Sequence, residues 1–241
     1  MTALYIISAF FAYFVKGVTG FASGLIFSSV LSFKLPTREI APIELILTIP
    51  ANFIMAWQGR KGIVLRKILP LCAVVLIGLV PGTLFLKYGD QRMIKIFLGA
   101  LIMVLGIEMF FRSRAEKRES NPYVLGAIGF VSGILCGLFG IGAFLTAYIS
   151  RTTKNTSDFK ANLCFVFIVE NLCRIALYAA AGFYTQQMLM TILYLVPVMA
   201  VGLALGMLTS KYISEKLTHI IIMVFLIISG AMLIVNNVFF V

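Results

Sequence analysis

Charged side chains are scarce in this sequence: Asp, Glu, Lys and Arg together make up 12% of its 241 residues. A soluble domain carries about 25% charged and about 45–50% apolar residues. This chain is 61% hydrophobic, with a mean hydropathy of +1.04. One soluble core cannot bury such an apolar excess, which excludes a water-soluble globular domain. We therefore expect an all-α protein that crosses a lipid bilayer several times.

Side chains that bind metals or act as nucleophiles are also few. There is one histidine, His219, and the four cysteines all lie in apolar runs without C-x-x-C spacing, at Cys72, Cys136, Cys164 and Cys173. The sequence has no phosphate-binding Gly-rich loop, no His-Glu metal motif and no nucleophile with a histidine to activate it. We predict no metal site, no cofactor, no disulfide and no enzymatic activity.

The net charge of +11 does not indicate a nucleic-acid-binding protein. The basic residues stand at the ends of apolar runs, as they do in the cytoplasmic flanks of membrane helices. We predict a multi-pass membrane protein with no nucleic-acid partner.

Spans of about 20 residues divide the chain into two halves, 1–111 and 122–241, joined by a polar cytoplasmic linker at 112–121. Each half begins with a Gly-interrupted segment and continues with three apolar ones. The first half comprises 3–33, 39–58, 68–87 and 92–111, and the second comprises 122–150, 159–182, 187–210 and 216–238.

The two halves match in order along the sequence. Gly17 and Gly20 recur as Gly137 and Gly140, Asn52 recurs as Asn171, and the G-x-x-x-G pair at 78–82 recurs at 202–206. Such a series indicates an internal repeat, which is common in transporters. The G-x-x-x-G faces allow helices to approach closely. We expect them to pack within one chain, with a homodimer contact as the alternative.

Basic residues also indicate whether the halves are parallel or inverted. If 3–33 and 122–150 cross the membrane fully, the halves are parallel. More of the Lys and Arg residues then lie outside than on the cytoplasmic side, which is the opposite of the usual distribution. If both are re-entrant hairpins that turn at their glycines, the second half is inverted and most of the 20 Lys and Arg residues are cytoplasmic. We predict inverted repeats. A turn at membrane depth also needs glycine and lines a cavity or lies within protein.

A re-entrant hairpin begins its second half-helix deep in the membrane, where free N–H groups and a dipole of about +0.5 charge favour an anion. Two inverted hairpins direct two such ends at one midplane site. The first contributes Lys16, Thr19, Gly20, Ser23 and Gly24, and the second contributes Gly137, Gly140 and Gly142. We predict a site for a small anion. The alternative is that the glycines serve only tight packing.

Two central segments carry polar residues. Glu44, Thr48 and Asn52 share one helix face of 39–58, and segment 159–182 carries Glu170, Asn171 and Arg174. Glu170 and Arg174 are spaced to pair. We predict that Asn52 and Asn171 line the substrate path, that Arg174 binds or steers the anion, and that Glu170 or Glu44 carries a coupling proton. A structural ion pair is the alternative.

Several motifs together resemble the sulfite exporter TauE/SafE family of membrane transporters over nearly the whole chain. They are the Gly-rich stretch 16–25 with FKLPTREIA at 33–41, RKGIV at 60–64, GLVPG at 78–82 and GLFGIG at 137–142. The resemblance implies transport of sulfite, organosulfonates, sulfoacetate or thiosulfate across a prokaryotic cytoplasmic membrane. The first segment departs from the family's longer glycine run, because other residues interrupt it.

We therefore expect a secondary transporter for a small organic or sulfur-containing anion. A passive anion channel and a non-transporting membrane scaffold are the competing interpretations.

Overall fold

The computed structural model describes residues 2–112, 122–142, 145–146, 148–149, 153, 156–210, 212 and 215–239. Over these residues every regular element is a helix, which confirms the all-α prediction. The predicted linker 112–121 lies outside the described residues except for Arg112, and so does part of the second predicted hairpin, 122–150.

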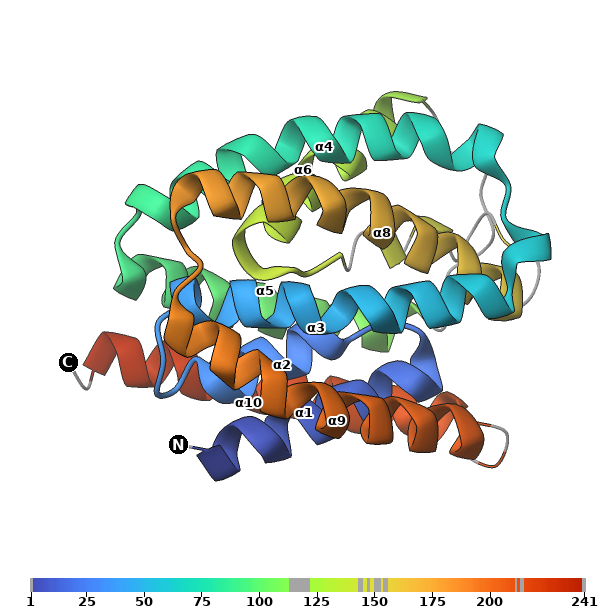
Figure 1. Ribbon diagram of the computed structural model, residues 1–241. Coiled ribbons are helices and arrows are strands. Elements are labelled where there is room, and N and C mark those ends of the chain that lie inside the picture. Colours follow the sequence, from blue (N-terminus) through green and yellow to red (C-terminus); the bar gives the residue numbers. More distant parts are fainter. Residues whose placement is uncertain are drawn as a thin grey trace.

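The helices follow one another with short connections (Figure 1). They are α1 (Thr2–Thr19), α2 (Ser23–Leu31), α3 (Thr37–Gln58), a 3-10 turn (Arg60–Gly62), α4 (Leu65–Tyr88), α5 (Gln91–Arg112), α6 (Pro122–Phe139), α8 (Thr156–Ala181), α9 (Gln186–Thr209) and α10 (Glu215–Phe239). Five of the described helices are long and apolar enough to cross a membrane, namely α1, α3, α4, α8 and α9.

The first apolar run is broken between α1 and α2. Gly20 and Ala22 have positive φ angles of 90° and 73°, and this left-handed geometry ends one helix and starts the next. Glycine adopts it without strain, whereas alanine does so at a cost. The break is narrower than the predicted 17–24, because Gly17 and Thr19 still belong to α1. Figure 1 shows that the N-terminus and the α2–α3 connection lie at the same end of the molecule.

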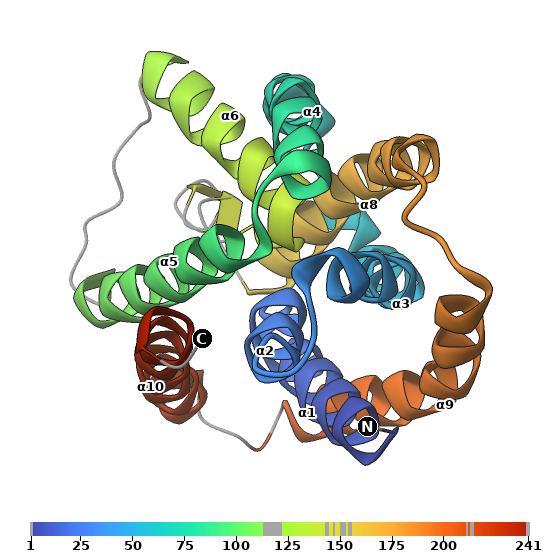
Figure 2. The same ribbon diagram turned by 90° about the vertical axis from the view of Figure 1, so that its left-hand side faces the viewer.

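Helices from the two halves pack in pairs. In the structure α4 lies against α6, α1 against α9, α5 against α10 and α3 against α8. Figure 2 looks along the helix bundle. The α4/α6 pair and the α5/α10 pair lie at separate edges of the bundle, and α2 and α3 lie towards its middle. Figure 1 shows α3 and α8 running in opposite directions, and the two chain ends at the same side.

The G-x-x-x-G faces lie in these contacts. A β-carbon on Gly78 would lie 2.9 Å from the Gly133 Cα on α6, and one on Gly202 would lie 2.7 Å from the Phe10 carbonyl oxygen on α1. Both faces therefore contact helices of the same chain. The backbones approach so closely because glycine has no side chain to keep them apart.

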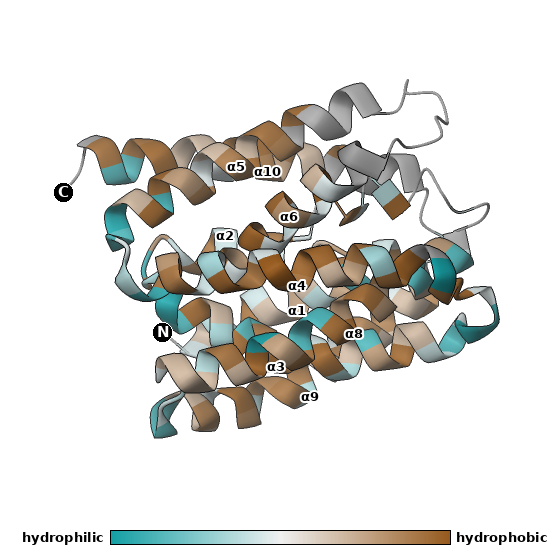
Figure 3. Ribbon diagram, turned by 90° about the horizontal axis from the view of Figure 1, so that it is seen from above, coloured by the Kyte–Doolittle hydropathy of each residue, from teal (hydrophilic) through white to brown (hydrophobic). Residues whose placement is uncertain are grey.

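The outer surface is apolar and the interior carries the polar groups. Large apolar side chains are exposed along the helix bodies, including Phe11, Ile77, Leu193 and Leu208. Figure 3 shows hydrophobic helix bodies with hydrophilic residues gathered towards the two ends. This distribution is typical of a membrane protein, in which lipid solvates the outside and costly charges lie inside.

Candidate functional site

The two helix breaks meet in the core. The first break, at 20–22, separates α1 from α2, and the second, at 140–142, follows the end of α6. Gly140 has a positive φ of 71°. A β-carbon on Gly24, in the first turn of α2, would lie 2.7 Å from the Gly140 carbonyl oxygen. The two breaks therefore touch, and they touch at two glycines, which have no side chain.

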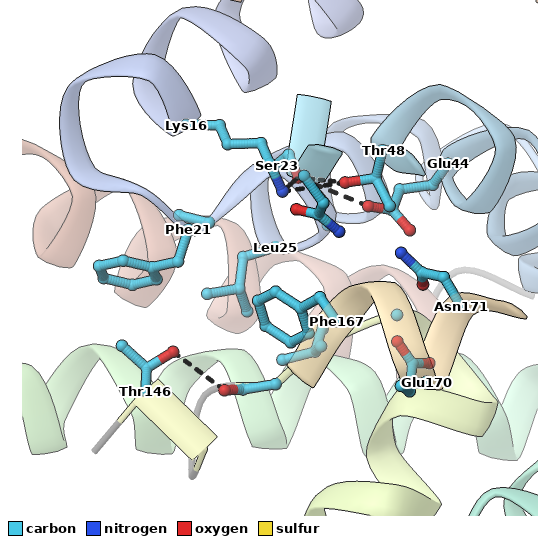
Figure 4. Close-up of a pocket in the computed structure, with 16 residues that line it drawn as sticks. Lys16, Phe21, Ser23, Leu25, Glu44, Thr48, Thr146, Phe167, Glu170 and Asn171 are labelled. Atoms are coloured by element: carbon cyan, nitrogen blue, oxygen red, sulfur yellow. Dashed lines mark hydrogen bonds between the residues drawn. The ribbon is translucent and has the colours of Figure 1, made fainter. Parts of the chain in front are cut away.

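A small cavity of about 30 Å³ lies between these breaks and the helices α3 and α8 (Figure 4). That is room for about two water molecules. Both halves of the chain contribute to its lining: Lys16, Phe21, Ala22, Ser23, Gly24, Leu25, Glu44, Thr48, Asn52, Gly140, Ile141, Gly142, Thr146, Phe167, Glu170 and Asn171.

Lys16 from α1 reaches this cavity with its ammonium group. The Lys16 Nζ donates to Thr48 Oγ1 at 2.9 Å and to Ser23 Oγ at 3.3 Å, and the side chain is 2% exposed. Among the described residues, no carboxylate oxygen lies within 4.0 Å of this nitrogen. Lys16 is thus a buried cation whose direct partners are hydroxyl groups.

Arg174 from α8 is held differently, because two carboxylates and a carbonyl surround it. Its Nη2 lies 3.2 Å from Glu44 Oε2, and its Nη1 lies 3.2 Å from Glu170 Oε1. Nη1 also donates to the Cys136 carbonyl oxygen at 2.6 Å. The Glu170–Arg174 pair expected from their spacing is present. Glu44 joins it from α3, so the pair is not confined to one helix.

Two basic side chains of α8 bind the C-terminal ends of α6 and α1, the helices that precede the two breaks. Arg174 binds Cys136 in the last turn of α6, and the Lys160 Nζ donates to the Val18 carbonyl oxygen near the end of α1 at 2.6 Å. Cations stabilise helix C-termini, where carbonyl groups and the negative dipole end are exposed. These negative ends therefore already have partners.

The N-terminus of α2 has no such partner. Its N-cap residue, Ala22, provides no side-chain hydrogen bond, and residues 21–25 line the cavity. The first backbone N–H groups of a helix have no acceptor within that helix. The cavity therefore faces the positive end of a helix dipole, beside the Glu44 carboxylate that accepts from the Ser23 hydroxyl at 3.5 Å.

Two buried amide side chains also line the cavity without hydrogen-bond partners. Neither Oδ1 nor Nδ2 of Asn52 has a partner, and Nδ2 of Asn171 has none; the residues are 0% and 1% exposed. An unsatisfied buried polar group costs about 1–3 kcal/mol. Other described residues also have buried polar atoms without partners, but Asn52, Asn171 and Glu170 line this cavity, where a bound ligand can supply the missing partner.

The remaining wall of the cavity is apolar. Phe21 and Leu25 come from the first break and α2, Ile141 comes from the second break, and Phe167 comes from α8. Figure 4 shows Phe21, Leu25 and Phe167 together, apart from the cluster of Lys16, Ser23, Thr48 and Glu44. The cavity therefore has one polar wall and one apolar wall.

The structure brings most of the predicted site residues to this cavity. Those that line it are Lys16, Ser23, Gly24, Glu44, Asn52, Gly140, Gly142, Glu170 and Asn171. Thr19, Gly20, Gly137 and Arg174 are not in the lining. Thr19 lies in the last turn of α1 and not in the first turn of α2, and its hydroxyl donates to the Val15 carbonyl oxygen at 2.8 Å. Gly137 lies in α6, where its carbonyl oxygen accepts from the Tyr178 hydroxyl.

Sequence reasoning missed seven lining residues: Phe21, Ala22, Leu25, Thr48, Ile141, Thr146 and Phe167. Thr48 was recognised on the face of Glu44 and Asn52 but was not assigned to the site, although that spacing is a sufficient signal. Phe21, Leu25 and Phe167 carry no signal, because an aromatic or aliphatic residue in an apolar segment looks like any core residue. Within the described part of the chain, no group of three or more His, Cys, Asp or Glu residues is arranged to hold a metal ion.

A family model described as "Sulfite exporter TauE/SafE" matches residues 5–233. Neither a curated protein nor a solved structure matches the chain.

Proposed function

Because this chain belongs to the TauE/SafE family of sulfite exporters, a multi-pass membrane transporter family, we propose that it is a secondary transporter of a small sulfur-containing oxyanion or organosulfonate. The anion binds at mid-membrane between the tips of two inverted helical hairpins. The protein resides in the cytoplasmic membrane.

The helix arrangement supports inverted repeats. If the halves are matched, α1 corresponds to α6, α3 to α8, α4 to α9 and α5 to α10. The observed pairs α4/α6 and α9/α1 are then equivalent to each other, while α3/α8 and α5/α10 each pair a helix with its own counterpart. A two-fold relation between the halves produces this pattern. The opposed directions of α3 and α8 in Figure 1 fit an axis in the membrane plane.

The observation that carries the proposal is the pair of unpartnered amides. Asn52 and Asn171 occupy matching positions of the two repeats and line one cavity, and each has free hydrogen-bonding capacity. A bound anion accepts from the amide Nδ2 groups and so recovers the cost of burying them.

Lys16 provides the positive charge that contacts the anion. Arg174 is already paired with Glu44 and Glu170, whereas the hydrogen-bond partners of Lys16 are hydroxyl groups that an anion can replace. The N-terminal turn of α2 adds free N–H donors next to Lys16. Arg174 acts through Glu44, by holding its carboxylate beside the Ser23 hydroxyl at 3.5 Å.

Charge balance supports proton coupling. Lys16 and Arg174 oppose Glu44 and Glu170, so the four buried charges of the site sum to zero. A monoanion adds an uncompensated buried negative charge, which is costly in the membrane interior. Protonation of Glu170 or Glu44, which both line the cavity, restores neutrality. We therefore assign the coupling proton to one of these carboxylates.

The size of the cavity supports a transporter over a passive channel. Its volume of about 30 Å³ holds about two waters, whereas a channel needs a continuous aqueous path. Entry of an anion requires the hairpin tips and α8 to separate. Movement of one repeat against the other supplies that step in transporters of this architecture.

Ligand-induced stabilisation of the purified chain tests the proposal. The ligands are sulfite, thiosulfate, sulfoacetate, taurine, phosphate and simple carboxylates. A ligand present at 100 times its Kd stabilises the protein by about 2.7 kcal/mol, which raises Tm measurably. We expect a response to sulfur anions. No response to any ligand would favour the non-transporting scaffold.

Flux in proteoliposomes separates a coupled transporter from a channel. We expect anion uptake to accelerate when a proton gradient is imposed and to collapse with a protonophore. Uptake that ignores the gradient and follows only the anion concentration would establish the passive channel.

A further inference from the structure

One residue of the apolar wall, Phe167, can take its position only because residue 142 is glycine and has no side chain. Phe167 on α8 is 9% exposed, and its ring fills the space in front of Gly142 in the second break. A β-carbon on Gly142 would overlap the Phe167 ring carbon Cε1 and would lie 2.6 Å from Cζ. The ring therefore stands where it does because residue 142 is glycine.

The same ring faces the charged end of the cavity. The Lys16 Nζ lies 5.7 Å from the centroid of the Phe167 ring. Figure 4 shows the Phe167 ring below the Lys16, Ser23 and Thr48 cluster and beside Leu25. A molecule whose anionic group contacts Lys16 must direct its remaining atoms towards the apolar wall that Phe167 completes.

The two walls favour one kind of anion. A tetrahedral oxyanion such as phosphate carries oxygens on every side, and those facing Phe21, Leu25 and Phe167 would lose their hydrogen bonds to water without replacement. Sulfite has its three oxygens on one side of the sulfur, but it has no apolar body to place against this wall. An anion with its oxygens at one end and a short apolar body at the other meets a suitable partner on each wall. Burial of each methylene then contributes to affinity.

We propose that Phe167 is the specificity-determining residue of this site: its ring, seated on Gly142, limits the length of the apolar body of an organic sulfonate whose head binds at Lys16. This inference rests on the proposed function. It assigns to Phe167 a role that is separate from binding the charge, since the ring contacts the far end of the substrate.

A homologous series of ligands tests the assignment. Kd is measured by thermal-shift titration of the full chain with sulfite and with methane-, ethane-, propane- and butanesulfonate. The four sulfonates share one negative charge and differ only in length. In the wild type we expect affinity to rise with the first one or two carbons and then to fall steeply. Each methylene that fits gains about fourfold in affinity.

Two substitutions should change the preferred length of the sulfonate in opposite directions. Phe167→Ala removes the ring, so the preferred sulfonate becomes longer and butanesulfonate gains at least about tenfold relative to methanesulfonate. Gly142→Ala pushes the ring into the cavity, so the preference moves to the shortest ligands. Phe167→Leu removes less of the side chain than Phe167→Ala does. It replaces Phe167→Ala in the test if that variant does not fold.

Phe165→Ala is the matched control. Phe165 lies on the same helix and packs against the core, but it does not line the cavity. We expect its affinity ranking to equal that of the wild type. A length profile that is the same in the wild type, Phe167→Ala and Phe167→Leu would overturn the role of Phe167 while leaving anion binding intact. A wild-type chain that binds none of the five anions would instead overturn the proposed function.

Discussion

The Arg174 guanidinium on α8 lies 3.2 Å from the Glu44 carboxylate on α3, so an ion pair joins the two halves of the chain beside the two helix breaks. Gly140 makes this approach possible. A β-carbon there would lie 2.5 Å from Glu44 Oε2 and 3.0 Å from Arg174 Nη1. The helix break and the ion pair therefore depend on each other.

Loss of Arg174 leaves two buried carboxylates without their cation. We expect Arg174→Met to destabilise the protein by about 3–5 kcal/mol, the usual cost of removing one partner of a buried pair. Tm in detergent measures the effect. The double variant Arg174→Met, Glu170→Gln leaves only the buried charges of Lys16 and Glu44, which cancel, and should recover part of the lost stability. A single variant as stable as the wild type would contradict this account.

Lys16→Met should weaken anion binding with little loss of fold. Met keeps the length and apolar stem of lysine but removes the charge and its hydrogen bonds. Because charge-assisted hydrogen bonds contribute about 1.5–3 kcal/mol, Kd should rise about tenfold to a hundredfold. Lys34→Met, at an exposed position of the α2–α3 connection, is the control and should bind as the wild type does. Equal affinities for the two variants would remove Lys16 from the site.

Asn52→Leu and Asn171→Leu should abolish transport without lowering Tm. Each replaces an amide that has unpartnered atoms with an apolar side chain of similar volume, which relieves a cost of about 1–3 kcal/mol. Asn162→Leu is the opposite control. The Asn162 amide donates to the carbonyl oxygens of Gly62 and Asp158 and accepts from the Val64 N–H, so the same substitution there should lower Tm. Uptake at the wild-type rate in the first two variants would exclude these amides from the substrate path.

Gly24→Ala should separate the hairpin tips. The added methyl group would lie 2.7 Å from the Gly140 carbonyl oxygen, so the two breaks cannot keep their contact. We expect a loss of about 1–3 kcal/mol, as for other overpacked cores, together with lost uptake. Gly126→Ala on α6 has no neighbour within 4 Å and should be neutral or stabilising by up to about 1 kcal/mol. If both variants behave alike, close approach of the tips is unimportant.

Single cysteines in the loops decide between inverted and parallel halves. The inverted arrangement places Gln187, at the start of α9, on the same side as Asp90 and opposite to Lys61. The parallel arrangement places Gln187 with Lys61. These three positions are exposed, and the four native cysteines are buried or half-buried. We expect a membrane-impermeant maleimide added outside to label Asp90→Cys and Gln187→Cys but not Lys61→Cys. Labelling of Gln187→Cys only after the membrane is opened would support the parallel arrangement.

Much of the fold was accessible from sequence because its signals are local. Twenty-residue apolar runs identify helices in lipid, and clustered glycines identify a break wherever the backbone needs a positive φ, as at Gly20 and Gly140. The family followed from motifs in order along the chain. Ser23, Asn52 and Asn171 were predicted to belong to one site, and the structure places all three in the lining of one cavity, since a polar residue in an apolar run faces the protein interior.

Contacts between helices were not accessible in the same way. The i, i+4 spacing predicted the Glu170–Arg174 pair, but only the packing of α3 on α8 decided that Glu44 shares that guanidinium. That packing in turn left Lys16 with hydroxyl partners, which is why we propose Lys16 as the cation that contacts the anion.

The sequence by itself determined that this protein lies in a membrane, is helical and has two Gly-rich breaks, because hydropathy and backbone sterics act within a few residues. Only the tertiary structure decided which buried charges pair and that Phe167 closes the cavity over Gly142. Those relationships depend on the rotation and register of helices far apart in the chain, which no local pattern specifies.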